Sequence, residues 1–254
     1  MTAPVTTPGR LTTVLLNQFD FTSQLDGRTR DSIVDQMDVT TFGNTSHVRA
    51  THNLDAKVDF TGFYDGSTAS SFNRVVESLL GTVGVITCSL AGNSIGAEAD
   101  LISGIISNDN VDAKEVGIET TKLSIIVTNP QPTTIDAPSM TFGKLLVPPT
   151  VVAVTTLVSG TGVTFVPVDG TKTNTQVVVH AHLLAASGAT TITLQSSPDG
   201  TTWTTVGTLI SSSTPTSVRA LFTTAIANTH FRVQYQGASQ PYTLAVALAL
   251  GASY

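Results

Sequence analysis

The chain has 254 residues, of which 41% are hydrophobic and 12% charged, and its formal net charge is −6 at pH 7. This length allows one or two domains with sizeable hydrophobic cores, and the charged share is about half of what globular proteins usually carry. The net negative charge excludes the basic surface by which most proteins hold nucleic acid. The single cysteine excludes a disulfide framework and a cysteine-based zinc site.

The charge is unevenly distributed along the chain. Residues 1–140 carry eight basic and sixteen acidic side chains, whereas residues 141–254 carry four basic and two acidic ones. We therefore expect an acidic first half and a nearly uncharged second half. No apolar run reaches the ~18 residues that cross a membrane, and the first residues lack a basic segment followed by an apolar core. We expect neither a membrane span nor a signal peptide, and folding in a cytoplasm.

The first expected element is a strand or extended arm over residues 12–21. A loop follows, from the turn at Asp26–Gly27 to Asp38. Residues 55–61 are predicted to form a strand, because their apolar residues alternate with polar ones. The polar run NTSHVRATHNLD precedes this strand, and unstructured runs of that length are usually functional or disordered.

Residues 39–66 read VTTFGNTSHVRATHNLDAKVDFTGFYDG. This stretch resembles the major tail tube protein of long-tailed, non-contractile bacteriophages. In that family a TTFG segment and a polar loop precede a strand that ends near a GFYDG-like turn. The resemblance covers roughly the first half of the chain. It is firmest at Thr40, Thr41, Phe42 and Gly43, which it marks as assembly residues with no catalytic role.

One helix is predicted over residues 70–80, where Ser70 or Ser71 can cap the start and Gly81 can end the helix. Its apolar stripe at helical spacing consists of Phe72, Val75, Val76, Leu79 and Leu80. Strands are expected next at 83–90, 97–107 and 116–128, with turns at 92–96 and 108–110. The first half is therefore expected to be a β-sandwich or open barrel with one helix packed on it. The tail tube resemblance implies the same architecture.

Residues 129–149 hold five of the eleven prolines. Proline resists both helix and ladder, so this stretch is expected to be a semi-rigid spacer. We place the domain boundary near residue 138, between a tail tube domain at 1–138 and a C-terminal accessory β-sandwich domain at 139–254. Few contacts are expected to cross this boundary, so the second domain should be separable.

The second half shows regularly spaced strand-like runs, which predict an immunoglobulin-like or jelly-roll β-sandwich. The runs are 150–158, 163–168, 176–185, 191–196, 202–209, 217–223, 230–236 and 242–250. The clearest hairpin spans residues 190–208 and turns at Pro198–Asp199–Gly200. The last strand has large apolar residues on one face and small residues on the other. Residues 194–208, LQSSPDGTTWTTVGT, followed by residues 231–238, FRVQYQGA, are similar to accessory β-sandwich domains appended to phage structural proteins, which usually decorate the particle exterior.

Residues 92–96, GNSIG, fit the G-x-S-x-G motif of the hydrolase nucleophile elbow. An acid at Asp109 or Asp112 and a base at His180 or His182 follow in the required order. The elbow needs a helix directly after the serine, however, and here a strand is expected. We therefore interpret Ser94 as a hairpin-turn residue and expect no enzymatic activity.

The sequence offers three further candidates for a site. His180 and His182 share one strand face at the spacing of a two-histidine metal pair, but the sequence nearby offers no third ligand, so a polar strand face is favoured and no metal or cofactor is expected. Trp203 can stack on a sugar ring, although covering the edge of a core is the favoured interpretation. Cys88 shares a strand face with Ile86 and Leu90, which favours a buried apolar role over a nucleophilic one.

The sequence thus predicts a structural virion protein of a phage tail, synthesised in the host cytoplasm. The resemblance implies hexameric rings that stack into a tube, the conduit for DNA delivery into the host. It also implies a set of partners: further copies of the chain, tail tip and tail terminator proteins, and the tape measure protein and transiting DNA in the lumen. An acidic lumen would repel phosphates and let DNA slide. Residues 45–54 and the N-terminal arm are expected to bridge adjacent rings.

Two alternatives come from other classes. The first is a surface-binding module, such as an adhesin or receptor-binding protein. The second is a hydrolase built on Ser94.

Overall fold

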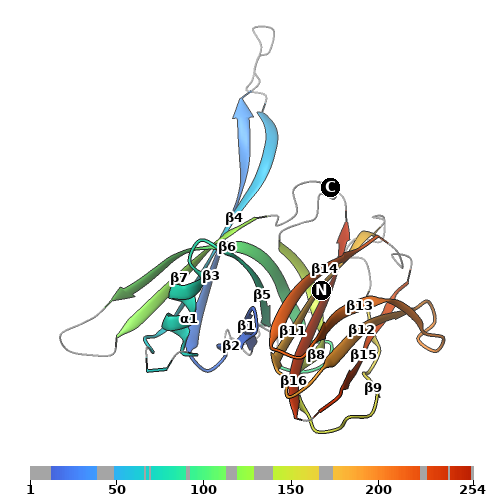
Figure 1. Ribbon diagram of the computed structural model, residues 1–254. Helices are drawn as coiled ribbons and strands as arrows, with labels where there is room; N and C mark the ends of the chain where they lie inside the picture. Colours follow the sequence, from blue (N-terminus) through green and yellow to red (C-terminus); the bar gives the residue numbers. More distant parts are fainter. Residues whose placement is uncertain are drawn as a thin grey trace, which may run out of the picture.

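The computed structural model describes residues 13–38, 49–65, 67–68, 70–89, 92–112, 119–128, 140–165, 174–223, 228–239 and 241–252. Within these ranges the chain is mainly β with a single helix, as the sequence predicts. Figure 1 shows two bodies side by side, one built from the first half of the chain and one from the second.

The first half contains seven described strands and the helix. These are β1 (Thr13–Leu16), β2 (Phe19–Asp20), β3 (Leu25–Asp38), β4 (Arg49–Phe63), α1 (Phe72–Leu79), β5 (Val83–Ser89), β6 (Glu98–Asp112) and β7 (Thr120–Val127). A curled antiparallel sheet, on which α1 packs, encloses their core. The core residues are Val14, Leu16, Phe21, Leu25, Val58, Phe60, Phe72, Val75, Val76, Ile86, Cys88, Ile102, Ile106, Leu123 and Ile125.

The predicted helix is confirmed, with one difference on its apolar stripe. Phe72, Val75 and Val76 are buried, and the ring of Phe72 meets Phe21 edge-on at 5.0 Å between centroids. Leu80 lies beyond the last helical turn and is 43% exposed, so it does not continue the stripe. Gly81 takes the left-handed conformation (φ 78°) that ends the helix, as predicted.

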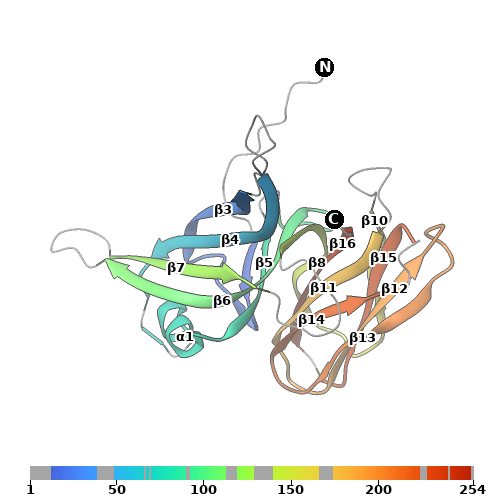
Figure 2. The same cartoon turned by 90° about the horizontal axis from the view of Figure 1, so that it is seen from above.

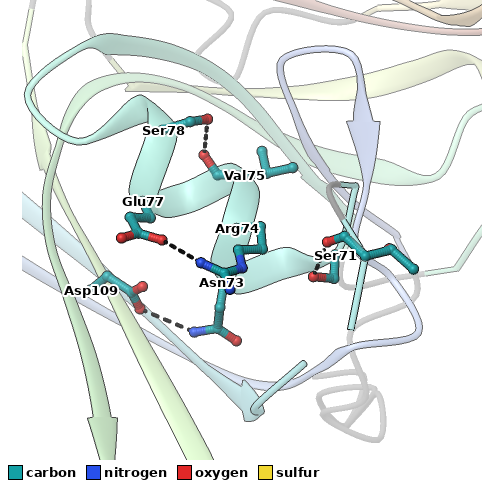
Figure 3. Close-up of polar contacts among 8 residues, drawn as sticks. Ser71, Asn73, Arg74, Val75, Glu77, Ser78 and Asp109 are labelled. Carbon is teal, nitrogen blue, oxygen red and sulfur yellow. Dashed lines mark hydrogen bonds and ion pairs between the residues drawn. The ribbon is translucent and has the colours of Figure 1, made fainter. Parts of the chain in front are cut away.

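A polar anchor ties α1 to the sheet, and Figure 3 shows part of it. The side-chain amide of Asn73 donates to Thr121 Oγ1 at 2.8 Å and to Asp109 at 3.4 Å. Its carbonyl oxygen accepts from the backbone N–H of Asp65 at 3.0 Å. Asn73 is 5% exposed, so these bonds satisfy an amide that helix packing removes from water.

Three predicted breaks in the first half are wrong. The polar run that precedes the predicted strand is itself part of β4 from Arg49 onward. Residues 26–38 form most of β3, which pairs with β4 from Leu25↔Gly62 to Asp38↔Arg49. The turn at 108–110 is also continuous strand, because β6 runs on to Asp112 against β7. Where burial is described, residues 26–31 and 108–112 are half-buried or exposed, and ladder hydrogen bonds hold these strand segments although they carry few apolar residues.

The second half is a two-layer β-sandwich. Its strands are β8 (Met140–Val152), β9 (Val158–Ser159), β10 (Val163–Thr164), β11 (Asn174–Ala185), β12 (Thr190–Ser197), β13 (Thr204–Ser212), β14 (Thr216–Phe222), β15 (His230–Gly237) and β16 (Tyr242–Ala252). One layer has the order β14-β11-β16-β8 and the other β10-β15-β12-β13, with β9 also on β15. The predicted hairpin is confirmed as β12 and β13.

The last strand, β16, has the two predicted faces. Its large residues enter the core between the two layers, namely Tyr242, Leu244, Val246 and Leu248, with Leu250 partly buried against it. Its other face carries Ala245, Ala247 and Ala249, which are also buried. Both faces of β16 are therefore covered, one by the sandwich core and one by the first half of the chain.

The proline pair 148–149 lies inside a strand, so residues 140–149 are not part of a spacer. Strand β8 pairs with β16 on both sides of the prolines, and the register shifts between Thr150↔Leu244 and Val147↔Val246. This irregularity leaves the two prolines, which have no N–H to donate, outside the ladder. The rest of the predicted spacer, residues 129–139, lies outside the described residues.

The two halves share one sheet. Strand β6 pairs with β8 from Glu98↔Lys144 to Ile102↔Met140, which joins the layer β14-β11-β16-β8 to the sheet of the first half. The structure thus differs from the expectation of few contacts between the halves. Each half nevertheless has a hydrophobic core of its own.

Candidate functional site: the junction and the projecting ribbon

A third, smaller apolar cluster lies where the halves meet. It brings together Ala97, Ala99 and Leu101 from the first half with Leu145, Val178, Ala247 and Ala249 from the second, and Leu221 packs against it. The alanines on β16 are small enough to let β6 and the sandwich layer approach closely. The small-residue face that the sequence predicts for the last strand therefore serves as the contact surface of this junction.

His180 and His182 lie in the same junction, both fully buried. Thr87 of β5 stands between them, with its Oγ1 at 2.8 Å from His182 Nε2 and 3.3 Å from His180 Nδ1. Two backbone carbonyls of the first half complete the cluster. Ile86 O lies 3.1 Å from His180 Nδ1, and Asn17 O lies 2.6 Å from His182 Nδ1. We call these five residues the histidine junction.

Burial lowers the pKa of both histidines. For His182 burial is the main cause, and the bond to Asn17 and the charge of Asp20 oppose it, leaving the pKa at about 4. For His180 burial, the neighbouring His182 and the charge of Arg219 all lower the pKa, which falls well below 6.5. Both rings are therefore neutral at pH 7.

A metal site built on His180 and His182 would need at least one further ligand. Among the residues that the structure describes, no group of three histidine, cysteine or acidic side chains is placed to hold a metal ion. The two rings instead form hydrogen bonds across the junction. Val177, Val179, Ala181 and Leu183 lie on the opposite face of β11, in the sandwich core, as predicted.

A buried ion pair lies at the same end of the first half. The Arg28 guanidinium on β3 contacts the Asp100 carboxylate on β6, with side chains 6% and 7% exposed. Cys88 pairs with Asp100 across the β5–β6 ladder and is fully buried. Burial raises the pKa of its thiol to about 12, against the opposing charge of Arg28. Cys88 is thus a buried thiol in the core beside Ile86, as the sequence predicts, and not a nucleophile.

Strands β3 and β4 extend beyond the rest of the molecule as a two-stranded ribbon (Figure 1). Strand β7 pairs with β4 only from Lys57 to Phe63, whereas the β3–β4 ladder continues to Asp38↔Arg49. This projecting ribbon leads into residues 39–48. The predicted assembly residues Thr40, Thr41, Phe42 and Gly43 belong to that segment, which lies outside the described residues, so their role stays a prediction.

Ser94 lies in an exposed turn between β5 and β6, as predicted. The backbone N–H of Ala97 donates to Ser94 O at 3.0 Å, and the chain then enters a strand instead of the helix that a nucleophile elbow requires. Of the two proposed acids, Asp112 ends β6, and Asp109 accepts hydrogen bonds from Asn73 and Thr121. The two proposed bases are hydrogen-bonded in the histidine junction. The hydrolase elements are therefore not assembled.

Replacing Ser94 by alanine is expected to change nothing chemical and to alter the free energy of unfolding by less than about 0.5 kcal/mol, as at other exposed positions. Denaturant unfolding and reaction with a fluorophosphonate probe check this. Labelling of the wild-type serine, and its loss in the variant, would revive the hydrolase alternative.

Trp203 is half-buried at the edge of the sandwich. The Arg232 guanidinium lies 4.3 Å from the centre of its ring, and the other end of the indole meets Gly162, where a Cβ would come within 2.8 Å of Trp203 Cη2. Arg232 is in turn held by a hydrogen bond from its Nε to Gln195 at 2.8 Å. These contacts favour the packing interpretation of Trp203 over the sugar-stacking one.

Within the described residues, no helix is long and apolar enough to cross a membrane.

Comparisons with known proteins give only distant likenesses. No protein-family model matches the sequence, and no curated protein matches it significantly. One is a chain from the tail of an empty gene transfer agent particle. The match covers 44% of the present chain and 83% of the tail chain, at 12% identity and a TM-score of 0.34. Another is a chain from the virion of a native gene transfer agent particle. The match covers 50% of the present chain and 95% of the virion chain, at 13% identity and a TM-score of 0.34.

A third structure is that of SPP1 Dit (gp 19.1), described as a paradigm of the hub adsorption apparatus in phages that infect Gram-positive bacteria. It aligns with 94% of this chain and 99% of its own, at 15% identity and a TM-score of 0.34. The proposal for the present chain therefore rests on its own residues.

Proposed function

We propose that this protein is a structural component of a phage tail and that its first half forms hexameric rings stacked into the tail tube. The observation that carries the proposal is the projecting ribbon, because its strands lead directly into the TTFG segment that resembles the tail tube family. A two-stranded ribbon is marginally stable alone in water. Burial against a second copy would stabilise it, and the polar residues 45–54 would then bridge adjacent rings.

The charge of the first half supports passage of DNA through such a tube. Sixteen acidic residues against eight basic ones in residues 1–140 favour a lumen that repels phosphates. Binding by counterion release needs clustered lysine and arginine, which this half lacks. The tape measure protein would occupy the lumen before DNA does, and tail tip and terminator proteins would cap the ends.

We propose that the second half, from near residue 138 onward, is a second domain fixed to the outside of the tube. Its separate core and its small positive balance support this placement, because cations lining a DNA channel would attract phosphates. The shared sheet and the junction would hold it in one orientation. The proposed role is structural, in the virion, with no catalytic step.

The purified full-length chain is expected to form rings or tubes at high concentration, as seen by negative-stain electron microscopy and light scattering. Knobs on the outside of the tube are expected at the position of the second half. A chain that lacks residues 39–48, joined by a two-residue Asn-Gly turn that suits a hairpin, should keep its circular dichroism and lose stacking.

The other outcomes discriminate the alternatives. Single rings that never stack would favour a hub at the tube end. A strict monomer that binds host cells would favour the receptor-binding module, which the exposed hydroxyl and amide side chains of β12 and β15, such as Thr191 and Gln236, would suit.

A further inference from the structure

The histidine junction places two titratable rings between two bodies that each have a core of their own. Thr87 and the carbonyls of Ile86 and Asn17 belong to the first half, and His180 and His182 belong to the second. Both rings are fully buried, so no bulk water solvates them. The contact between the halves therefore includes groups that can change charge.

The hydrogen-bond partners define which protons are present. A carbonyl oxygen only accepts, so Nδ1 of each ring must carry the hydrogen that faces Ile86 O or Asn17 O. His182 Nε2 is then unprotonated and accepts from the Thr87 hydroxyl at 2.8 Å. His180 Nε2 is also unprotonated, and it is buried without a hydrogen-bond partner. Both rings are thus neutral tautomers with one open proton site each.

A second proton on either ring disturbs the hydrogen bonds of the junction. On His182 it would face Thr87 Oγ1, which would have to turn its own hydrogen away in order to accept. On His180 it would be a buried, charged N–H with no partner, on a ring whose ladder neighbour is the cation Arg219, a costly arrangement. The charged groups that act on the two rings are Arg219 of β14, which opposes protonation of His180, and Asp20 of β2, which favours protonation of His182.

We propose that the histidine junction is an acid-sensitive latch: uptake of a proton by His180 or His182 breaks the contact between β11 and β5 and lets the second half move relative to the first. The ladder between β6 and β8 stays paired and acts as the hinge. The two separate cores stay intact on either side of it. This inference does not depend on the tail role.

The pH range over which the latch opens follows from the difference in proton binding between the closed and the open state. In the open state the rings are solvated and have the ordinary histidine pKa of about 6.5, whereas His182 in the closed state has a pKa of about 4. The open state thus binds more protons between these values, so the closed state is fully favoured above pH 6.5 and loses its advantage as the pH falls toward 4. His182 alone changes the ratio of closed to open molecules by about two orders of magnitude over this range.

Hydroxyl-radical labelling of side chains, read by mass spectrometry, tests the latch on the full-length wild-type chain, because the ladders of β5 and β11 stay paired when the contact between their side chains opens. Between pH 7 and pH 4, His180 and His182, which are fully buried in the closed state, are expected to lose about 100-fold in protection from labelling. Phe72 of α1 and Phe231 of β15, which lie in the separate cores, should keep their protection. Equal loss in all elements would mean global unfolding and would overturn the latch, as would protection that is unchanged at pH 4.

Variants separate the two rings from other acid effects. His182→Gln keeps hydrogen-bonding capacity but cannot titrate, so the labelling of His180 should show a much flatter pH response. His230→Gln is the matched control, since His230 is half-buried on β15 beside Thr229 and outside the junction, and its response should equal that of the wild type.

A second readout needs no variant and decides the matter if His182→Gln does not fold. Exchange of the imidazole C2 hydrogen should be slow for His180 and His182 at pH 7 and should report pKa values below the ordinary histidine value of about 6.5. Ordinary titration of both rings near pH 6.5 would overturn the proposal.

Discussion

A chain that ends at residue 139 is expected not to reach the native fold. The cut removes β8, which leaves the β6 edge from Glu98 to Ile102 without its ladder partner. It also exposes Leu101, which is 1% exposed in the intact chain, together with the alanines of the junction cluster. Lost apolar burial and lost hydrogen bonds together amount to about 4–6 kcal/mol, comparable with the whole stability of many domains.

The measurements are circular dichroism, thermal unfolding and light scattering of the truncated chain. We expect a broad transition at a lower temperature, or aggregation through the uncovered β6 edge. Co-expression of residues 1–139 with residues 140–254 is the control, because the added fragment restores β8 and the junction. It should recover a single sharp transition. A truncated chain that melts sharply with native β signal would instead support the separable second domain expected from the sequence.

The sequence predicts the elements whose periodicity is set by a core. The strands of the second half alternate because one face enters the sandwich, and α1 shows a stripe because Phe72, Val75 and Val76 meet the core. Strand β3 escapes prediction since much of it lies in the projecting ribbon and carries polar residues on both faces. The pair Pro148–Pro149 misleads for a local reason, because a register shift in the β8–β16 ladder accommodates residues that cannot donate.

The junction is harder to predict, because it joins residues far apart in the chain. Thr87 and His180 are 93 positions apart, and no local pattern pairs them. The sequence does contain partial signals. Thr87 lies on the strand face that points away from Ile86 and Cys88. His180 and His182 share one face of an otherwise apolar strand, and β16 has a face of alanines. Each signal indicates a covered second face, but only the three-dimensional fold brings the faces together. The role of Thr40 to Gly43 remains a prediction.

Asp100→Asn is expected to destabilise the protein by about 3–5 kcal/mol, the usual cost of leaving one member of a buried ion pair without its partner. The Arg28 guanidinium would remain inside the first half with its charge uncompensated: its Nη2 would lose the Asp100 carboxylate, and its Nη1 has no hydrogen-bond partner. Arg28→Met should cost a similar amount, because the carboxylate is then the isolated charge. Urea unfolding at pH 7, followed by circular dichroism, measures both.

The double variant Arg28→Met with Asp100→Leu distinguishes lost attraction from desolvation. Apolar side chains of similar size often replace a buried pair at little cost, so the double variant should be more stable than either single variant.

The control is the helix pair Arg74 and Glu77, 3.4 Å apart and visible in Figure 3. Their side chains are 59% and 66% exposed, so Glu77→Gln should change stability by less than about 1 kcal/mol. If Asp100→Asn is as mild as Glu77→Gln, water must reach the Arg28 guanidinium, and the pair would belong to an open surface and not to the core beside Cys88.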